Sequence, residues 1–287
     1  MILCLILTIL TIEPAKPVTL ESVGKLRHEP IREASGLVQS RRYPGIFWVL
    51  NDSGNPPALF AVERDGALVR EYRVNIPNID WEDVATDEQG RLYIGEIGNN
   101  DGRLAVRGVY RLDEPDPRID GERTLSINAA SYYHMPQGAR FDAEALVIDG
   151  DRALIVAKTF DRREAEVYSF PLEPAAPLLR PARPRRVAVL AGFLEPVTGA
   201  DLAPDGRLVV CSLKSVGIYQ KSGGDRFDRL AIREFRVEDQ IEAVCWDGWD
   251  IILAGEDRGI FRLASAAWRE PASTSNSKKS ATSGSHP

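Results

Sequence analysis

One pattern of two short apolar segments is repeated five times along the 287-residue chain, and it constrains the fold more than any other feature. Each copy opens with polar residues, continues as an apolar segment, crosses a turn and returns as a second apolar segment. The paired segments are residues 33–38 and 46–52, 80–85 and 91–96, 142–147 and 153–158, 198–203 and 207–212, and 240–245 and 251–256. Short apolar segments joined by turns, most of which contain Gly, are typical of β-hairpins. The chain is therefore expected to consist of repeated antiparallel hairpins.

Further strand-like segments indicate how these hairpins assemble. Two such segments follow each of the first four hairpins, whereas only residues 259–263 follow the fifth. Residues 18–28 alternate apolar and polar side chains and have no partner nearby, so they can supply the missing strand. Repeats of four short strands every ~40–60 residues are typical of a β-propeller. We predict an all-β chain, a β-propeller of four-stranded blades closed by its N-terminal strand, which leaves no free sheet edge. The motif count predicts five blades, and the long interval between residues 80 and 142 leaves room for a sixth.

The two ends of the chain differ in composition from the repeats. Residues 1–12 are almost entirely apolar, too few for a bilayer span of ~20 residues but suited to the core of a signal peptide. We expect residues 1–16 to be a signal or N-terminal apolar segment, with a buried first strand as the alternative. Residues 269–287 contain no apolar side chain larger than alanine, so we expect a disordered tail. The propeller is expected to occupy residues 17–268 of a secreted or periplasmic protein.

Charge and residue types argue against several classes of function. The net charge is −6 and the pI is near 5.3, whereas nucleic-acid binding needs a basic surface. The three cysteines and three histidines lack the spacing of a zinc site, and we expect Cys211 and Cys245 to be buried free thiols. We therefore predict a monomer with no nucleic-acid partner and no stable membrane span.

Carboxylates recur where the first segment of each pair begins. Alignment of the five copies on an apolar position places together Ser35, Glu82, Glu144, Ala200 and Glu242, and two residues earlier Glu33, Asp80, Asp142, Thr198 and Gln240. Side chains two residues apart in a strand point the same way, and a hairpin places the end of its second strand beside the start of its first. We therefore expect these groups to gather at one end of the propeller axis. Asp83 and Asp201 have the opposite phase and are expected to contribute less.

A group of carboxylate and amide oxygens suits Ca²⁺, which takes roughly 6–8 oxygen ligands. The predicted metal ligands are Asn51, Asp80, Glu82, Glu96, Asn99, Asp142, Glu144 and Glu242. If the site is catalytic, we expect Glu82 or Glu144 to act as base or nucleophile and Lys158 to provide the counter-charge. The alternative is structural, because Asp and Asn often hold turns by bonding to the backbone, and carboxylates at strand starts can hold adjacent blades.

The segments EASGL, DWEDVA, DAEAL and TGADL resemble those of exported bacterial β-propeller proteins that have no settled activity. More distantly they resemble calcium-dependent propellers, namely gluconolactonase-like lactonases, phosphotriesterase-like propellers and β-propeller phytases. The resemblance covers residues 33–263. In lactonase-like propellers a glutamate and several Asn or Asp residues on the axis hold a catalytic Ca²⁺, and the resemblance implies that this glutamate is Glu82 or Glu144. It implies Asn51 and Asn99 as amide ligands. The chain differs in having more carboxylates, fewer asparagines and five expected blades in place of six.

Two functions are compatible with these expectations. One is a Ca²⁺-dependent hydrolase of esters, lactones or phosphoesters. The other is a non-catalytic propeller that binds a small-molecule ligand or a protein at the axis. The fold does not choose between them, because propellers host unrelated functions. The sequence shows neither a Ser/His/Asp set nor a phosphate-binding glycine loop, so the choice depends on the geometry of the site.

Overall fold

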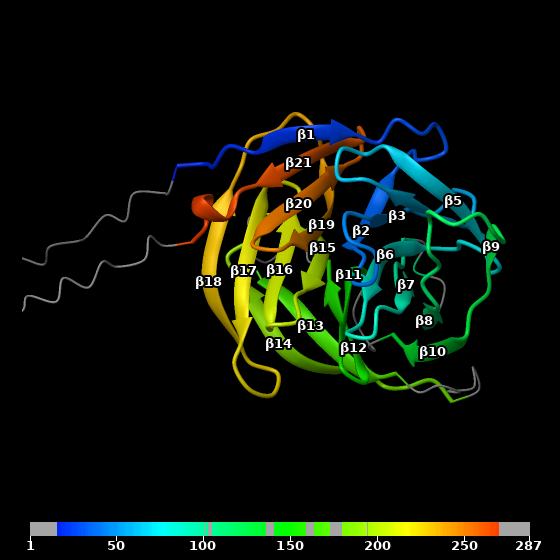
Figure 1. Ribbon diagram of the computed structural model, residues 1–287. Helices are drawn as coiled ribbons and strands as arrows, with labels where there is room; N and C mark the ends of the chain where they lie inside the picture. Colours follow the sequence, from blue (N-terminus) through cyan, green and yellow to red (C-terminus); the bar gives the residue numbers. More distant parts are fainter. Residues whose placement is uncertain are drawn as a thin grey trace, which may run out of the picture.

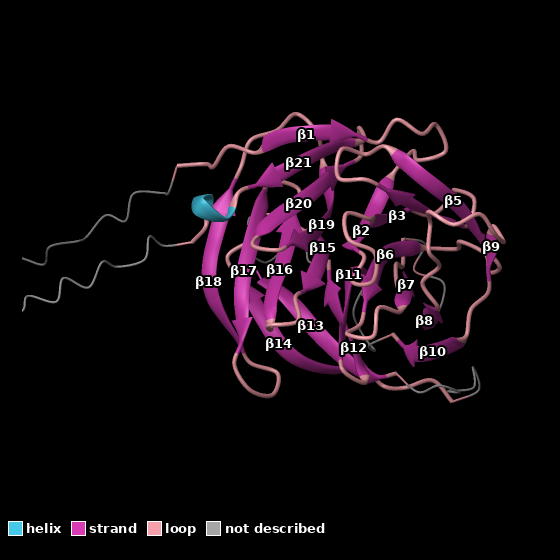
Figure 2. Ribbon diagram, viewed as in Figure 1, coloured by secondary structure: helices cyan, strands magenta, loops and turns pink. Residues whose placement is uncertain are grey.

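The computed structural model describes residues 16–100, 102, 105–135, 141–158, 164–172, 180–193 and 195–269. Its strands form five separate sheets arranged around a central axis, so the chain is a five-bladed β-propeller (Figure 1). Strands account for nearly all of the regular structure, and the helical element in the described residues is the single turn η1 (Ser265–Ala267) (Figure 2). The predicted all-β class and the count of five blades are confirmed.

Each blade is a sheet of four antiparallel strands that follow one another outward from the axis. Blade 1 contains β2 (Ala34–Gln39), β3 (Phe47–Asn51), β4 (Ala58–Val62) and β5 (Leu68–Val74). Blade 2 contains β6 (Trp81–Thr86), β7 (Leu92–Glu96), β8 (Val106–Leu112) and β10 (Ala129–His134). Blade 3 contains β11 (Ala143–Asp149), β12 (Arg152–Ala157), β13 (Glu164–Pro171) and β14 (Arg185–Ala191). Blade 4 contains β15 (Val197–Leu202), β16 (Arg207–Ser212), β17 (Ser215–Lys221) and β18 (Phe227–Glu234). Blade 5 contains β19 (Ile241–Asp247), β20 (Asp250–Gly255), β21 (Gly259–Leu263) and β1 (Glu21–Lys25).

The first strand of the described chain completes the last blade, as predicted. β1 runs antiparallel to β21, with Glu21 opposite Arg262 and Lys25 opposite Gly259. The strand is shorter than the expected span of residues 18–28, and the fully buried Leu26 follows directly after it. The ring is therefore closed by hydrogen bonds between the two ends of the propeller rather than by a continuous chain.

The position of a strand in its blade explains its sequence pattern. The inner strands β2, β6, β11, β15 and β19 contact one another around the axis (Figure 1). In β6 and β15 every residue is buried, polar ones included, because blades cover both faces of an inner strand. The outer strands β14 and β18 lie at the blade edges and carry several exposed residues.

The long interval between residues 80 and 142 is occupied by a connection rather than a sixth blade, as far as the described residues show. After β8 the chain runs back to blade 1, where β9 (Thr124–Leu125) adds to β5 as a short parallel strand, and then returns as β10. The Arg70 guanidinium of β5 binds the Asp120 carboxylate of this connection at 2.8 Å. Blades 1 and 2 are thus joined at their outer edges as well as at the axis.

The five inner strands share one irregularity close to their N-terminal ends. The pairing register with the next strand shifts at Ser35, Glu82, Glu144, Thr198 and Glu242. A residue inserted in this way is a β-bulge, and it interrupts the alternation of side chains between the two faces. The sequence alignment placed Ala200 at this position in the fourth repeat, and that assignment is wrong. Thr198 takes the position, because the apolar residue two beyond the bulge is Ala200 and not Leu202, on which the fourth repeat was aligned.

Side chains just beyond the bulges face the neighbouring blade. A Cβ on Gly36 would lie 2.8 Å from the backbone nitrogen of Val84 in blade 2, so only glycine fits there. Asp83 has the equivalent position in blade 2, and its carboxylate accepts a hydrogen bond from Leu146 N of blade 3 at 2.9 Å. Asp201 similarly accepts one from the backbone of blade 5 at 2.9 Å. These two carboxylates tie inner strands together, which agrees with the lower rank given to them as site residues.

The remaining expectations concern the cysteines and the chain ends. Cys211 and Cys245 are buried free thiols, as predicted. No helix among the described residues is long and apolar enough to cross a bilayer. The predicted signal segment at residues 1–16 and the predicted disordered tail at 269–287 lie outside the described residues, apart from Lys16 and Arg269.

Candidate metal site

Five carboxylates gather at the N-terminal end of the inner strands, which we call the axial mouth. This acidic cluster consists of Asp52, Asp80, Glu82, Asp142 and Glu144. It contains two overlapping groups of three, Asp52 with Asp80 and Glu82, and Glu82 with Asp142 and Glu144. Within each group one oxygen from every carboxylate lies within 4.8 Å of the others, a spacing that allows all three to bind one metal ion. Glu82 belongs to both groups.

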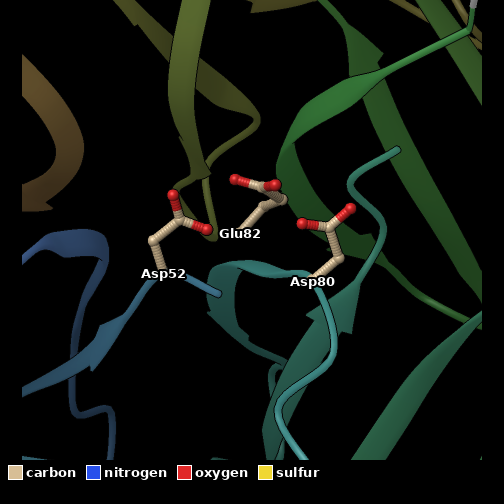
Figure 3. Close-up of side chains that lie close together, drawn as sticks. All are labelled: Asp52, Asp80 and Glu82. Atoms are coloured by element: carbon tan, nitrogen blue, oxygen red, sulfur yellow. The ribbon is translucent and has the colours of Figure 1, made fainter. Parts of the chain in front are cut away.

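The first group joins blades 1 and 2. Asp52 follows the end of β3, Asp80 directly precedes β6, and Glu82 is the bulge residue of β6. Figure 3 shows the three carboxylates turned toward one another at the ends of these elements. Asp80 and Glu82 are 5% and 2% exposed, so their charges are almost completely removed from water. Burial of like charges in this way is unfavourable without a cation.

Glu82 is the least satisfied member of the cluster. Its Oε1 is buried and has no hydrogen-bond partner among the described residues. A Cβ on Gly98 would come within 2.0 Å of this oxygen and 2.8 Å of Asp80 Cγ, so both carboxylates pack against the glycine. Burial, reinforced by the charges of Glu144 and Asp52, raises the pKa of Glu82 well above its ordinary value. A bound cation would provide the partner that Oε1 lacks.

The second group joins blades 2 and 3. Asp142 precedes β11, and Asn99 N donates a hydrogen bond to it at 2.7 Å from the loop after β7. Glu144 is the bulge residue of β11, and it accepts a hydrogen bond from Lys158 Nζ at 2.8 Å. Burial raises the pKa of Glu144 to about 7 against the attraction of Lys158. Burial alone would lower the pKa of Lys158, but the charges of Glu144 and Asp142 hold it above its ordinary value.

In the described part of the chain, Lys158 is one of two cationic groups bonded to the cluster, and the second, Arg107, contacts Asp80. The Arg107 guanidinium, 3% exposed, lies 3.3 Å from Asp80 Oδ2 and also donates to Asn99 Oδ1 at 3.2 Å. Asn100 donates to both oxygens of Asp80, through its backbone nitrogen and its side-chain amide. Asp80 is therefore held firmly in place, whereas Glu82 beside it is not.

Two predicted ligands, Asn51 and Glu96, bind backbone instead. The Asn51 oxygen accepts hydrogen bonds from the nitrogens of Arg32 and Glu33 just before β2. Glu96 accepts hydrogen bonds from the nitrogens of Ile79 and Asp80 just before β6. The two residues end equivalent strands, and each fastens the segment that enters its own inner strand. They support the mouth and are not members of the acidic cluster.

Glu242, the bulge residue of β19, lies beside the acidic cluster but belongs to neither group of three. It is only partly buried. Burial and the nearby charge of Glu144 raise the pKa of Glu242 to about 8. It is thus a carboxylate with partial access to solvent, beside groups that have little.

Asp52 is the member of the cluster that the sequence prediction did not include. The sequence has two adjacent polar residues at this point, Asn51 and Asp52, and Asn51 was named because the resemblance to lactonase-like propellers implies amide ligands. Neighbouring residues in a strand point to opposite sides. Asn51 turns toward the segment before β2, and Asp52 toward Asp80 and Glu82. Alternation along the strand, which places Asn51 and Asp52 on opposite sides, was the available signal.

The metal-free protein should lose stability as the pH rises from about 4.3, where glutamates of the unfolded chain ionise, to about 8, where Glu242 of the folded protein does. A glutamate in an unfolded chain has a pKa of about 4.3. The folded protein raises that of Glu144 to about 7 and that of Glu242 to about 8. The folded state therefore keeps protons that the unfolded state has released, and this stabilisation disappears as the two groups ionise. Thermal unfolding in a chelator should show a melting temperature that falls by several degrees across this range, and a rise would contradict the assignment. Excess Ca²⁺ should remove most of the slope, because a bound cation replaces the protons.

Comparison with known proteins does not identify a family for this chain. No protein-family model matches it, and no curated protein sequence matches it either. The fold and the geometry of the acidic cluster are therefore the basis for any statement about function.

Proposed function

We propose that the axial mouth binds a Ca²⁺-type divalent cation and uses it to hydrolyse an ester, lactone or phosphoester. The observation that carries the proposal is Glu82, a buried carboxylate with an unpartnered oxygen among four other carboxylates. The donors are all oxygens, which suits hard cations such as Ca²⁺ and argues against zinc, for which nitrogen and sulfur ligands are typical. Asp52, Asp80, Glu82, Asp142 and Glu144 are the proposed ligands.

The residues around the cluster suit hydrolysis. A cation bound among these carboxylates would polarise the oxygen of the bond to be cleaved. The side chain of Lys158 is 24% exposed, and it can donate a hydrogen bond to an oxygen that gains negative charge. The side chain of Glu144 is only 7% exposed, so it is better placed as a ligand than as a base. Glu242 is only partly buried and lies beside the cluster, so it is the carboxylate better placed to accept a proton from water.

Calcium titration of the metal-stripped full chain should release or absorb heat and define a saturable site. Gly98→Ala should weaken this binding by tenfold or more, since its methyl group would meet Glu82 Oε1 at 2.0 Å and displace the carboxylate. No carboxylate is removed by this change, so a loss of binding reports geometry rather than charge. Hydrolysis of nitrophenyl esters, lactones and phosphoesters should require Ca²⁺ and stop in a chelator.

Gly121→Ala is the matched control, because a Cβ at Gly121 meets nothing within 4 Å. It should bind calcium as the parent does. Absence of binding at millimolar Ca²⁺ would refute the proposed site. Calcium binding without any metal-dependent hydrolysis would refute the catalytic part. This second outcome would favour a non-catalytic propeller that binds a ligand or a protein at the axial mouth.

A further inference from the structure

The acidic cluster divides into two sets of candidate ligands. Its five carboxylates fall into two overlapping groups of three rather than into a single compact set. Asp52 and Asp80 flank Glu82 on one side, and Asp142 and Glu144 flank it on the other. We propose that the axial mouth holds two divalent cations, with Glu82 as the ligand common to both. This inference rests on the proposed cation-binding role, which it extends from one ion to two.

The charge balance agrees with two ions. Among the described residues, the cationic groups bonded to the cluster are Arg107, which contacts Asp80, and Lys158, which contacts Glu144. The five carboxylates of the cluster and the neighbouring Glu242 carry six negative charges when all are ionised, so the two cationic groups leave four. One divalent cation would neutralise half of this excess, and two would neutralise all of it.

The surroundings of Glu82 support a bridging role. It is 2% exposed, lies in the middle of the cluster, and has a buried oxygen without a hydrogen-bond partner. Asp80 and Glu144, by contrast, each have a cationic partner. A carboxylate has two oxygens, so one side chain can bind a different ion with each. Pairs of metal ions close together are a recurrent arrangement in enzymes that cleave phosphoesters and related bonds.

The number of bound ions tests the proposal directly. Metal-stripped full-length protein should bind two Mn²⁺ or Ca²⁺ per chain in a calorimetric titration. Asp52→Asn and Asp142→Asn should each reduce the count from two to one, because each removes a ligand from one group only. Glu82→Gln should weaken the binding of both ions. In electron paramagnetic resonance, the parent loaded with two Mn²⁺ should show magnetic coupling between them, and Asp52→Asn should not.

The control is Asp151→Asn, which changes an exposed carboxylate in the turn between β11 and β12, at the other end of the blade. It should keep two ions. A parent that binds a single ion would overturn the two-ion proposal and leave the proposed function standing. A parent that binds none would overturn both. Two ions that persist unchanged in both Asn variants would show that the sites lie elsewhere, which also overturns it. The count in the parent needs no variant, so it remains decisive if a substitution prevents folding.

Discussion

Glu82→Gln should raise the melting temperature of the metal-free protein and abolish the further rise that Ca²⁺ produces in the parent. The change removes one buried negative charge from the cluster, and the new amide can donate hydrogen bonds to neighbouring carboxylates. A ligand at a hundred times its dissociation constant stabilises the native state by about 2.7 kcal/mol. For a domain of this size that corresponds to a shift on the order of 5–10 °C, which thermal unfolding measures easily. The parent should show this shift and the variant should not.

Glu88→Gln provides the control, because Glu88 is exposed in the turn between β6 and β7, at the opposite end of the same strand. It should melt as the parent does and keep the full response to Ca²⁺. If Glu82→Gln melts below the parent without metal and responds to Ca²⁺ to the same extent, Glu82 is not a ligand. The cluster would then be a structural feature of the mouth.

Deletion of residues 17–29 should lower the melting temperature on the order of 10–20 °C, or prevent folding. The deletion removes β1, exposes the whole edge of β21, and withdraws Leu20 and Leu26, which are 8% and 0% exposed. Burial of each leucine is worth ~1.5–3 kcal/mol, and hydrogen bonds of the strand ladder add to this. Their sum approaches the ~5–15 kcal/mol by which a typical domain is stable. Size-exclusion chromatography should also show self-association through the open edge.

The comparison is deletion of residues 270–287, a Ser-rich segment whose composition predicts no contribution to the core. This variant should melt within a degree or two of the parent. If the two deletions melt alike, ring closure by β1 does not contribute to stability as the pairing with β21 suggests.

The repeat pattern was sufficient to predict the fold because all five blades use the same hairpin. The missing strand after residues 259–263 also indicated how the ring closes. Sequence could not show β9, because a two-residue parallel pairing between distant segments has no local signature. Its absence from the prediction left the interval before residue 142 open to a sixth blade, which the described residues do not contain.

The sequence predicted the position of the axial mouth but only some of the residues that form its acidic cluster. Glu82, Glu144 and their preceding aspartates gather as the aligned repeats suggested. The rule that side chains two residues apart share a face fails at a bulge, and every inner strand has one there. The fourth repeat was misplaced by two residues because Leu202 rather than Ala200 was taken as its aligned apolar position. Glu96 could not be separated from the cluster members, because a carboxylate that bonds the backbone looks the same in sequence as one that faces a cavity.

Closure by β1 also sets an order of events during synthesis. Glu21 pairs with Arg262, which is 241 residues later in the chain. At ~5–20 residues per second, a ribosome needs on the order of ten to fifty seconds to make that intervening length. β1, the first of the described strands to leave the ribosome, is therefore the last to find its partner, and four blades can assemble before it does. During this time the N-terminal segment is accessible to chaperones and proteases, and a premature stop anywhere before β21 would leave it permanently unpaired.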